Sequence, residues 1–124
     1  MNVSDINIKN ARIIIKWCYK TLGKSKYRKY SKLKISISRK TLWPGAYYEI
    51  GDISIIEINP KRHKSFDGFI DTMIHEYIHF LQNTKYYLKI MEMTGYENHP
   101  MEQTSNMIAK LLREKCRKEV FNDR

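Results

Sequence analysis

Two histidines and a glutamate near the middle of the chain have the spacing of a metal-activated hydrolytic site. The segment His75-Glu76-Tyr77-Ile78-His79 fits the pattern HExxH. Residues four apart lie on one face of a helix, so both imidazoles can bind a single metal ion. Glu76 would then lie beside the open coordination position, where a carboxylate can take a proton from water. We therefore expect His75 and His79 to be ligands of a zinc ion and Glu76 to be the general base.

The spacing of apolar residues around this motif predicts the helix that carries it. The segment from Ser65 to Asn83 contains no proline, and Ser65 or Asp67 can cap its start. Its apolar residues recur at helical spacing, and they are Ile70, Met73, Ile74, Tyr77, Ile78 and Leu81. The two histidines flank this stripe, so the metal would lie at the edge of the core. Exclusion of water there would strengthen its pull on ligands and substrate.

A third metal ligand is expected downstream, because catalytic zinc usually has three protein ligands and one water. Pro100 suits the first turn of a helix, where its missing N–H needs no partner. On that helix Glu102 and Asn106 lie four residues apart on one face. Glu102 can bind the metal while Asn106 hydrogen-bonds a ligand imidazole. His99 is the alternative third ligand, and Glu97 is a further candidate.

The motif and the glutamate helix together resemble the gluzincins, in which HExxH is followed by a glutamate on a later helix. The similarity is to small single-domain forms, the minigluzincins and the ImmA/IrrE-type metallopeptidases, whose glutamate helix often reads E-x-E-A-N-x-x-A. This chain keeps Glu102, Asn106 and Ala109 and differs at Thr104 and Ser105. The resemblance covers about half of the chain. It implies a soluble zinc endopeptidase that acts on a protein or peptide substrate.

Two other interpretations stay open beside this one. An HExxH with a distant histidine resembles the SprT-like proteases, which act on proteins attached to DNA, and His99 would then be the third ligand. The chain could also be a non-catalytic zincin-fold module that binds partners through a basic surface. Glu76 favours catalysis, because a purely structural metal site needs no glutamate at that position.

The rest of the chain predicts an α+β fold of one domain, residues 1–124, equivalent to a minimal zincin lobe. We expect an N-terminal helix and a three-stranded antiparallel or mixed sheet before the motif helix and the C-terminal glutamate helix. In zincins an edge strand beside the active-site helix pairs with extended substrate. The last of the three predicted strands is our candidate for that edge. The predicted elements are a helix over Asp5–Leu22, strands over Leu33–Ile37, Tyr47–Ile50 and Ile53–Ile58, and a tight turn at Gly51-Asp52.

Several residues around the motif carry smaller expectations. The connector Lys85–Gly95 is apolar for a loop, so we expect it to pack as a helical turn over the site. Tyr87 or Tyr96 could donate a hydrogen bond to the oxyanion that forms during hydrolysis. Trp43-Pro44-Gly45 is expected to be a turn with an aromatic plug, and His63, in a basic loop, is expected to face solvent.

The charge balance is strongly basic, with 23 Lys and Arg against 13 Asp and Glu. An excess of this size attracts polyanions. Basic residues between positions 24 and 40, interleaved with Tyr27 and Tyr30, could contact phosphates and stack on bases. A nucleic-acid partner is therefore an expectation, although no nucleic-acid-binding motif is present. A composition rich in lysine and isoleucine is the plain alternative explanation.

The compartment is inferred from what the sequence lacks. There is no signal peptide and no segment of transmembrane length, so we expect a cytoplasmic protein without a membrane partner. Cys18 and Cys116 are far apart on two predicted helices and are expected to be reduced core residues. The charged end, Arg117 to Arg124, is expected to be frayed.

Overall fold

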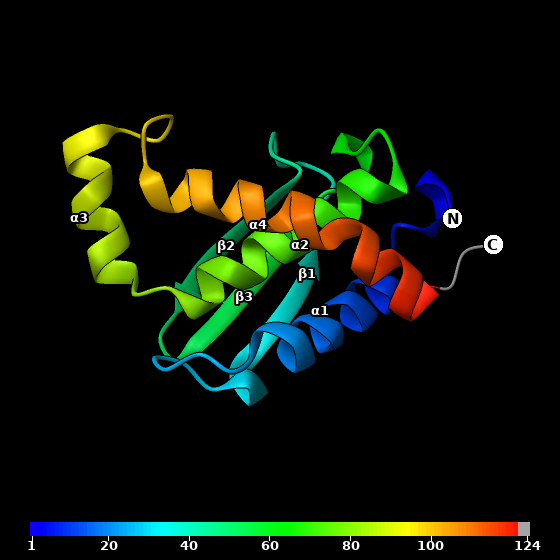
Figure 1. Ribbon diagram of the computed structural model, residues 1–124, viewed down its shortest axis with the longest axis horizontal. Helices are drawn as coiled ribbons and strands as arrows, with labels where there is room; N and C mark the ends of the chain where they lie inside the picture. The colour runs from blue at the N-terminus through cyan, green and yellow to red at the C-terminus, as the bar shows by residue number, and fades with distance from the viewer. Residues whose placement is uncertain (122–124) are drawn as a thin grey trace.

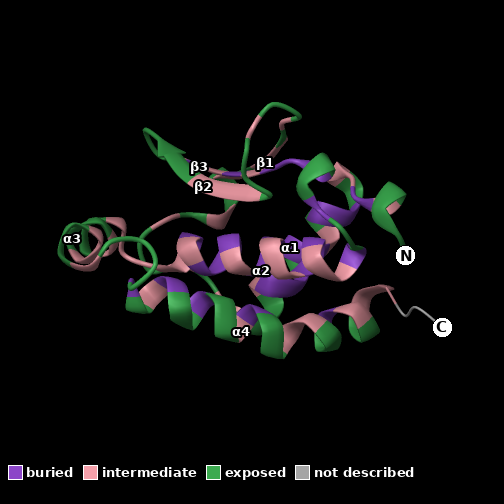
Figure 2. Cartoon of the chain, turned by 90° about the horizontal axis from the view of Figure 1, so that it is seen from above, coloured by how far each residue is buried: buried purple, intermediate pink, exposed green. Residues whose placement is uncertain are grey.

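Helices and a mixed sheet form three layers. The computed structural model describes residues 1–121, and within them α1 (Ile8–Leu22) and α2 (Phe66–Leu81) cover one face of the sheet. On the other side of α2 lies α4 (Pro100–Cys116), so α2 is sandwiched between the sheet and α4 (Figures 1 and 2). The remaining helix, α3 (Thr84–Thr94), stands at the opposite end of the molecule from the termini. The predicted α+β fold is confirmed.

The sheet is mixed and has the strand order β1-β3-β2. Its strands are β1 (Leu33–Ile37), β2 (Gly45–Ile50) and β3 (Ile53–Ile58), with β1 parallel and β2 antiparallel to β3. The prediction that Ile53–Ile58 is an edge strand is therefore wrong. A hairpin turn identifies only one neighbour of β3. The second neighbour, β1, pairs in parallel across a longer connection that leaves no local signal. Within the described residues, the strand beside α2 with a free edge is β2.

Helix α1 begins later than its apolar pattern suggests. Asn7 accepts a hydrogen bond from the Asn10 N–H and caps the helix, so the prediction of a start at Asp5 is wrong by about one turn. At the other end Gly23 adopts a φ of 90° and donates its N–H to the Tyr19 carbonyl, so the helix ends after Leu22, as predicted.

The core lies between α1, α2 and the inner face of the sheet. Cys18 and Cys116 are both buried and free, as expected of core residues. Burial, and to a smaller extent the neighbouring Cys116, raise the pKa of the Cys18 thiol. Burial also raises the pKa of Cys116 to about 12. Both thiols therefore remain protonated and unreactive at neutral pH.

The C-terminal segment packs on this core instead of fraying. Arg117–Phe121 form a π-helical turn. The Phe121 ring contacts the Phe66 ring edge-on at 4.9 Å, and Trp17 Nε1 donates to Glu119 Oε1 at 3.1 Å. The expectation of a frayed end is wrong as far as Phe121, and residues 122–124 lie outside the described part. Among residues 1–121, no helix is both long and apolar enough to cross a membrane.

Two loop predictions are also wrong. His63 is buried, donates from Nε2 to the Pro44 carbonyl at 3.1 Å and packs edge-on against Phe69. The turn Pro60–Arg62, capped by Asn59, folds this basic loop back against the protein. Trp43 is 67% exposed and is no plug.

Candidate metal and catalytic site

The HExxH helix and the glutamate helix bring three donor atoms to one point. His75 Nε2 and His79 Nε2 lie 3.0 Å apart. Glu102 Oε1 lies 2.9 Å from the first and 3.1 Å from the second. The separation of 23 residues between His79 and Glu102 is closed by the packing of α4 on α2. The small buried residues Ser105 and Ala109 of α4 permit this close approach.

The donor set fits a zinc ion in both chemistry and spacing. Two imidazole nitrogens and one carboxylate oxygen are a common protein ligand set for catalytic zinc. Zinc bonds of 2.0–2.2 Å at tetrahedral angles put ligand atoms about 3.3 Å apart. The three mutual distances here are close to that value. His75, Glu76 and His79 also form a group that could hold a metal ion.

A hydrogen-bond chain fixes the orientation of His79. Its Nδ1 lies 2.8 Å from Gln82 Oε1. The Gln82 amide Nε2 donates to Ser105 Oγ, and that hydroxyl in turn donates to the Met101 carbonyl. Because the amide nitrogen is already directed at Ser105, Oε1 must accept from His79 Nδ1–H. This leaves Nε2 of His79 as the nitrogen available to a metal.

Asn106 does not occupy the role expected of it. Its side chain is exposed and lines the cleft onto which His75 and His79 also open. Within the described residues, however, no hydrogen bond joins it to either histidine. Gln82 is the residue that hydrogen-bonds a ligand imidazole, that of His79. Sequence reasoning could have found it, because Gln82 lies three residues after His79, at the C-cap of α2. A polar side chain there can fold back over the last turn.

Glu102 is held as an anion by its neighbours. Tyr87 donates its hydroxyl to Glu102 Oε2, while Oε1 faces the two histidines. Burial alone would raise the pKa of Glu102, but the hydrogen bonds from His75, His79 and Tyr87 hold it well below its ordinary value. An ionised carboxylate is the form that binds a metal. The contact also means that Tyr87 positions Glu102 in this structure and is not free to serve as an oxyanion donor.

His99 is committed elsewhere in the fold. Its Nδ1 accepts from the Met101 N–H and caps α4, and its Nε2 donates to the Tyr87 carbonyl at 2.9 Å. The Tyr87 ring stacks on His99 and meets His79 edge-on, so it lies against both imidazoles. Both nitrogens of His99 are therefore occupied in an entirely buried side chain. Of the alternative third ligands, Glu97 is exposed and lines the cleft.

Glu76 lies in a confined position next to β2. It is 7% exposed, and burial raises the pKa of its carboxyl above the ordinary value. A Cβ on Gly45 would come within 3.5 Å of Glu76 Cγ and only 2.5 Å from Thr72 Cγ2. Glycine is therefore required at position 45 for β2 to pass this close to the motif helix. Its role could not be predicted from the turn-like sequence around it.

Arg28 ties the basic linker to the end of the motif helix. Its Nη1 donates to the carbonyls of Phe80 and Gln82, at 2.7 Å and 2.6 Å. Its Nε contacts Glu49 Oε2 on β2 at 2.6 Å, and Nη2 donates to Thr84 at the start of α3. One buried guanidinium therefore joins α2, α3 and β2. Arg28 is a positioning residue, not a surface residue free for phosphates as its place in the basic linker suggested.

A cleft of about 1180 Å³ opens over the site, and its lining includes His75, Glu76, His79 and Glu102. Its walls include β2 on one side and α3 with the following loop on the other, and Trp43, Leu88 and Tyr96 are exposed along it. Burial and the nearby Glu102 carboxylate raise the pKa of Tyr96, so its hydroxyl remains a donor at neutral pH. The connector that was expected to pack over the site is α3, which has no buried residue. It forms a wall of the cleft.

Comparisons of the chain with protein-family models, with curated proteins and with solved structures found no match.

Proposed function

We propose that the protein is a zinc-dependent endopeptidase of the gluzincin type. The observation that carries this proposal is the meeting of His75 Nε2, His79 Nε2 and Glu102 Oε1 beside the buried carboxylate of Glu76. A structural metal site needs its ligands and nothing more. Here a fourth residue, the acid Glu76, lies next to the three proposed ligands and lines an open cleft.

Each residue of the site has a defined task in this proposal. His75, His79 and Glu102 would hold the zinc, which when bound polarises the scissile carbonyl and acidifies water. Glu76 takes a proton from the attacking water as its oxygen bonds to the carbonyl carbon. The same carboxyl then gives that proton to the leaving amine as the C–N bond breaks. A raised pKa suits a group that must both accept and return a proton. Tyr96 lines the cleft and keeps its hydroxyl proton, so we propose it as the hydrogen-bond donor to the oxyanion.

The substrate is proposed to bind as an extended strand along β2. The outer edge of β2 has no partner strand within the described residues, and β2 lines the cleft from Gly45 to Glu49. Backbone hydrogen bonds to such an edge would give affinity without a strong demand on sequence. The apolar side chains along the cleft favour unfolded or flexible protein segments with large apolar residues.

A cleavage assay with the Glu76→Gln variant tests the proposal. The unmutated protein, purified without chelator, is expected to cleave unfolded casein or a mixed peptide library. Chelator should stop cleavage, and added zinc should restore it. Glu76→Gln should keep the zinc and the unfolding temperature but lose a factor of roughly 10² to 10⁴ in rate, since glutamine cannot accept the proton. Equal cleavage by both proteins would contradict the mechanism.

A DNA-associated protease of the SprT type is the second candidate. The basic charge of the chain favours it. The hydrogen bonds that occupy both nitrogens of His99 weigh against its ligand set. A non-catalytic zincin-fold module is the third candidate, and it would bind zinc but give no cleavage in the assay above with any unfolded substrate.

A further inference from the structure

The net positive charge comes from one part of the chain. Between Ile6 and Tyr48 there are twelve Lys and Arg and no Asp or Glu. From Glu49 to the end there are eleven basic and twelve acidic residues. The net charge of +10 therefore comes from the segment that forms α1, β1 and their connection. The segment that forms the candidate site is nearly neutral.

Within the basic segment, α1 carries a continuous line of cations. Lys9, Arg12, Lys16 and Lys20 recur every three or four residues and therefore lie on one face of the helix. All four are exposed, whereas the opposite face of α1 is buried in the core. At a rise of 1.5 Å per residue, the line is about 16 Å long. We call these four residues the α1 basic stripe.

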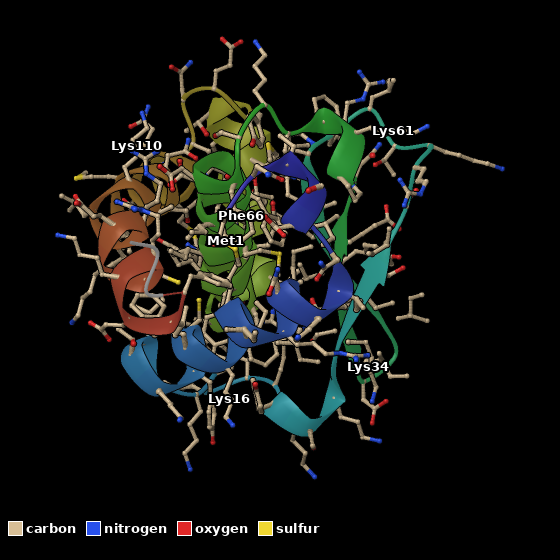
Figure 3. The ribbon with its side chains drawn as sticks, turned by 90° about the vertical axis from the view of Figure 1, so that its right-hand side faces the viewer. Met1, Lys16, Lys34, Lys61, Phe66 and Lys110 are labelled. Atoms are coloured by element: carbon tan, nitrogen blue, oxygen red, sulfur yellow. The ribbon has the colours of Figure 1, made fainter. Side chains whose placement is uncertain are left out.

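The stripe borders a second element of the same charge. A groove of about 260 Å³ lies between α1 and β1, with Arg12 and Lys34 among its lining residues. Figure 3 shows Lys16 and Lys34 at the same lower side of the molecule, pointing away from the core, with Lys110 and Lys61 elsewhere. The loop after α1 adds Lys24, Lys26 and Lys29, all exposed.

Within the described residues, these cations are not neutralised by acidic side chains. Among residues 1–121, no ion pair includes a member of the α1 basic stripe, and the ion pairs of the segment are Arg28–Glu49 and Lys32–Asp52. The guanidinium of Arg28 is occupied by its contacts with Glu49 and the end of α2, so it is not available to an external anion. Tyr30 is also unavailable, because its ring stacks on Tyr19 at 4.1 Å. Tyr27, at 55% exposure, is the aromatic residue of the linker that is free to stack.

We propose that the α1 basic stripe and the adjoining loop bind the phosphate backbone of a nucleic acid. A line of about 16 Å matches a polyanion with regularly spaced charges, since a duplex presents one phosphate per 1.7 Å or so of its axis. A membrane surface fits less well. Helices that bind membranes expose apolar residues beside their cations, and no large hydrophobic residue of α1 is exposed. The exposed Tyr27 among lysines adds a surface for base stacking.

A binding titration tests this proposal. Fluorescent 20-nucleotide oligonucleotides, duplex and single-stranded, are titrated with the full-length protein at 50 and 200 mM salt, and the affinity is measured at each. The first variant changes the four stripe residues to Gln. The matched control changes Lys61, Lys64, Lys85 and Lys89 to Gln, which removes the same charge from other exposed positions. Each lost phosphate contact lowers the salt slope by about 0.9 for a duplex and 0.7 for a single strand. The change in salt should therefore weaken duplex binding by the unmutated protein about 100-fold more than binding by the stripe variant.

The control should retain most of the salt dependence, and both variants should keep the unfolding temperature of the unmutated protein. The dissociation constants of the duplex and the single strand at the same salt concentration then identify which form of nucleic acid is preferred. Equal losses in the two variants would overturn the proposal, because binding would then depend on net charge alone. It would also be overturned if phosphatidylserine vesicles or polyglutamate bound as tightly as the oligonucleotides and lost binding in the same variant.

Discussion

The two halves of the chain use charge in opposite ways. In the half that begins at Glu49, the charged groups of the candidate site and of the contact between α2 and α4 face one another. Glu102 lies among two histidines and a tyrosine, and Arg113 pairs with Asp71 at 2.9 Å. In the half that ends at Tyr48, a series of lysines and arginines faces solvent without partners on the protein. In our proposals the first arrangement positions atoms for catalysis, and the second produces a positive field that attracts a nucleic acid.

Two basic residues of the first half depart from this division. Lys32 forms an exposed ion pair with Asp52 at 3.8 Å, and Arg28 connects the two halves through buried contacts. Arg28 belongs to the basic segment by sequence, but its guanidinium donates hydrogen bonds to the end of the motif helix and to Glu49. The role of a basic residue therefore depends on its partners in the fold and not on its neighbours in sequence. The two proposed functions can be tested independently, because loss of the α1 basic stripe should leave the metal site intact and loss of site residues should leave polyanion binding intact.

The largest effect on stability is expected from Arg28→Ala. The change leaves the carbonyls of Phe80 and Gln82 and the Glu49 carboxylate without their buried donor, so it should cost roughly 2–4 kcal/mol of unfolding free energy. Arg28→Lys should recover only part of this, because one ammonium group cannot reach four acceptors on three elements. The measurement is urea denaturation, with the exposed Lys29→Ala as control at less than about 0.5 kcal/mol. Similar values for Arg28→Ala and Lys29→Ala would show that the contacts of Arg28 do not stabilise the fold.

A smaller effect, restricted to the metal site, is expected from Gln82→Ala. Without the acceptor, His79 loses the contact that fixes its tautomer, and such losses typically weaken metal binding roughly 10- to 100-fold. Gln82→Glu keeps an acceptor at the same position and should retain most of the affinity. A zinc-competition titration with a chromophoric chelator measures both. Unchanged affinity in Gln82→Ala would mean that the His79–Gln82 contact has no role in metal binding.

The smallest effect concerns the contact between β2 and α2. Gly45→Ala places a Cβ against Thr72 Cγ2, and Thr72 cannot turn away without losing its hydrogen bond to the Gly68 carbonyl. We expect a loss of about 1–2 kcal/mol. Thr72→Ser removes the clashing methyl group and keeps the hydroxyl, so it should restore stability in the double variant. A double-mutant cycle by thermal or urea unfolding gives the coupling, and additive effects would show that the clash is not the cause.

The sequence predicted the elements that bear local signals and missed those defined by distant partners. The cap at Ser65, the start of α4 at Pro100 and the convergence of Glu102 with the two histidines could be predicted from spacing and turn chemistry. The edge position of β2 could not, because parallel pairing between β1 and β3 is a non-local event.

The supporting contacts of the site were missed for a related reason. Arg28 reaches Gln82 across 54 residues, and no periodicity in the sequence relates the two positions. His63 was expected to face solvent because its neighbours are basic, yet the fold buries it against Phe69. A residue's immediate neighbours predict the average environment of a segment, and they do not predict which single side chain turns inward.

We propose that His75, His79 and Glu102 together form one zinc site, and X-ray absorption spectroscopy at the zinc edge tests this directly. The protein is purified without chelator and its zinc content measured on the same sample. We expect one zinc per chain, with two imidazole nitrogens and low-atomic-number oxygen neighbours at about 2.0–2.2 Å. The imidazole signal should fall in His75→Ala and in His79→Ala, and it should not change in His99→Ala. Absence of stoichiometric zinc, or a third imidazole that disappears in His99→Ala, would contradict the account.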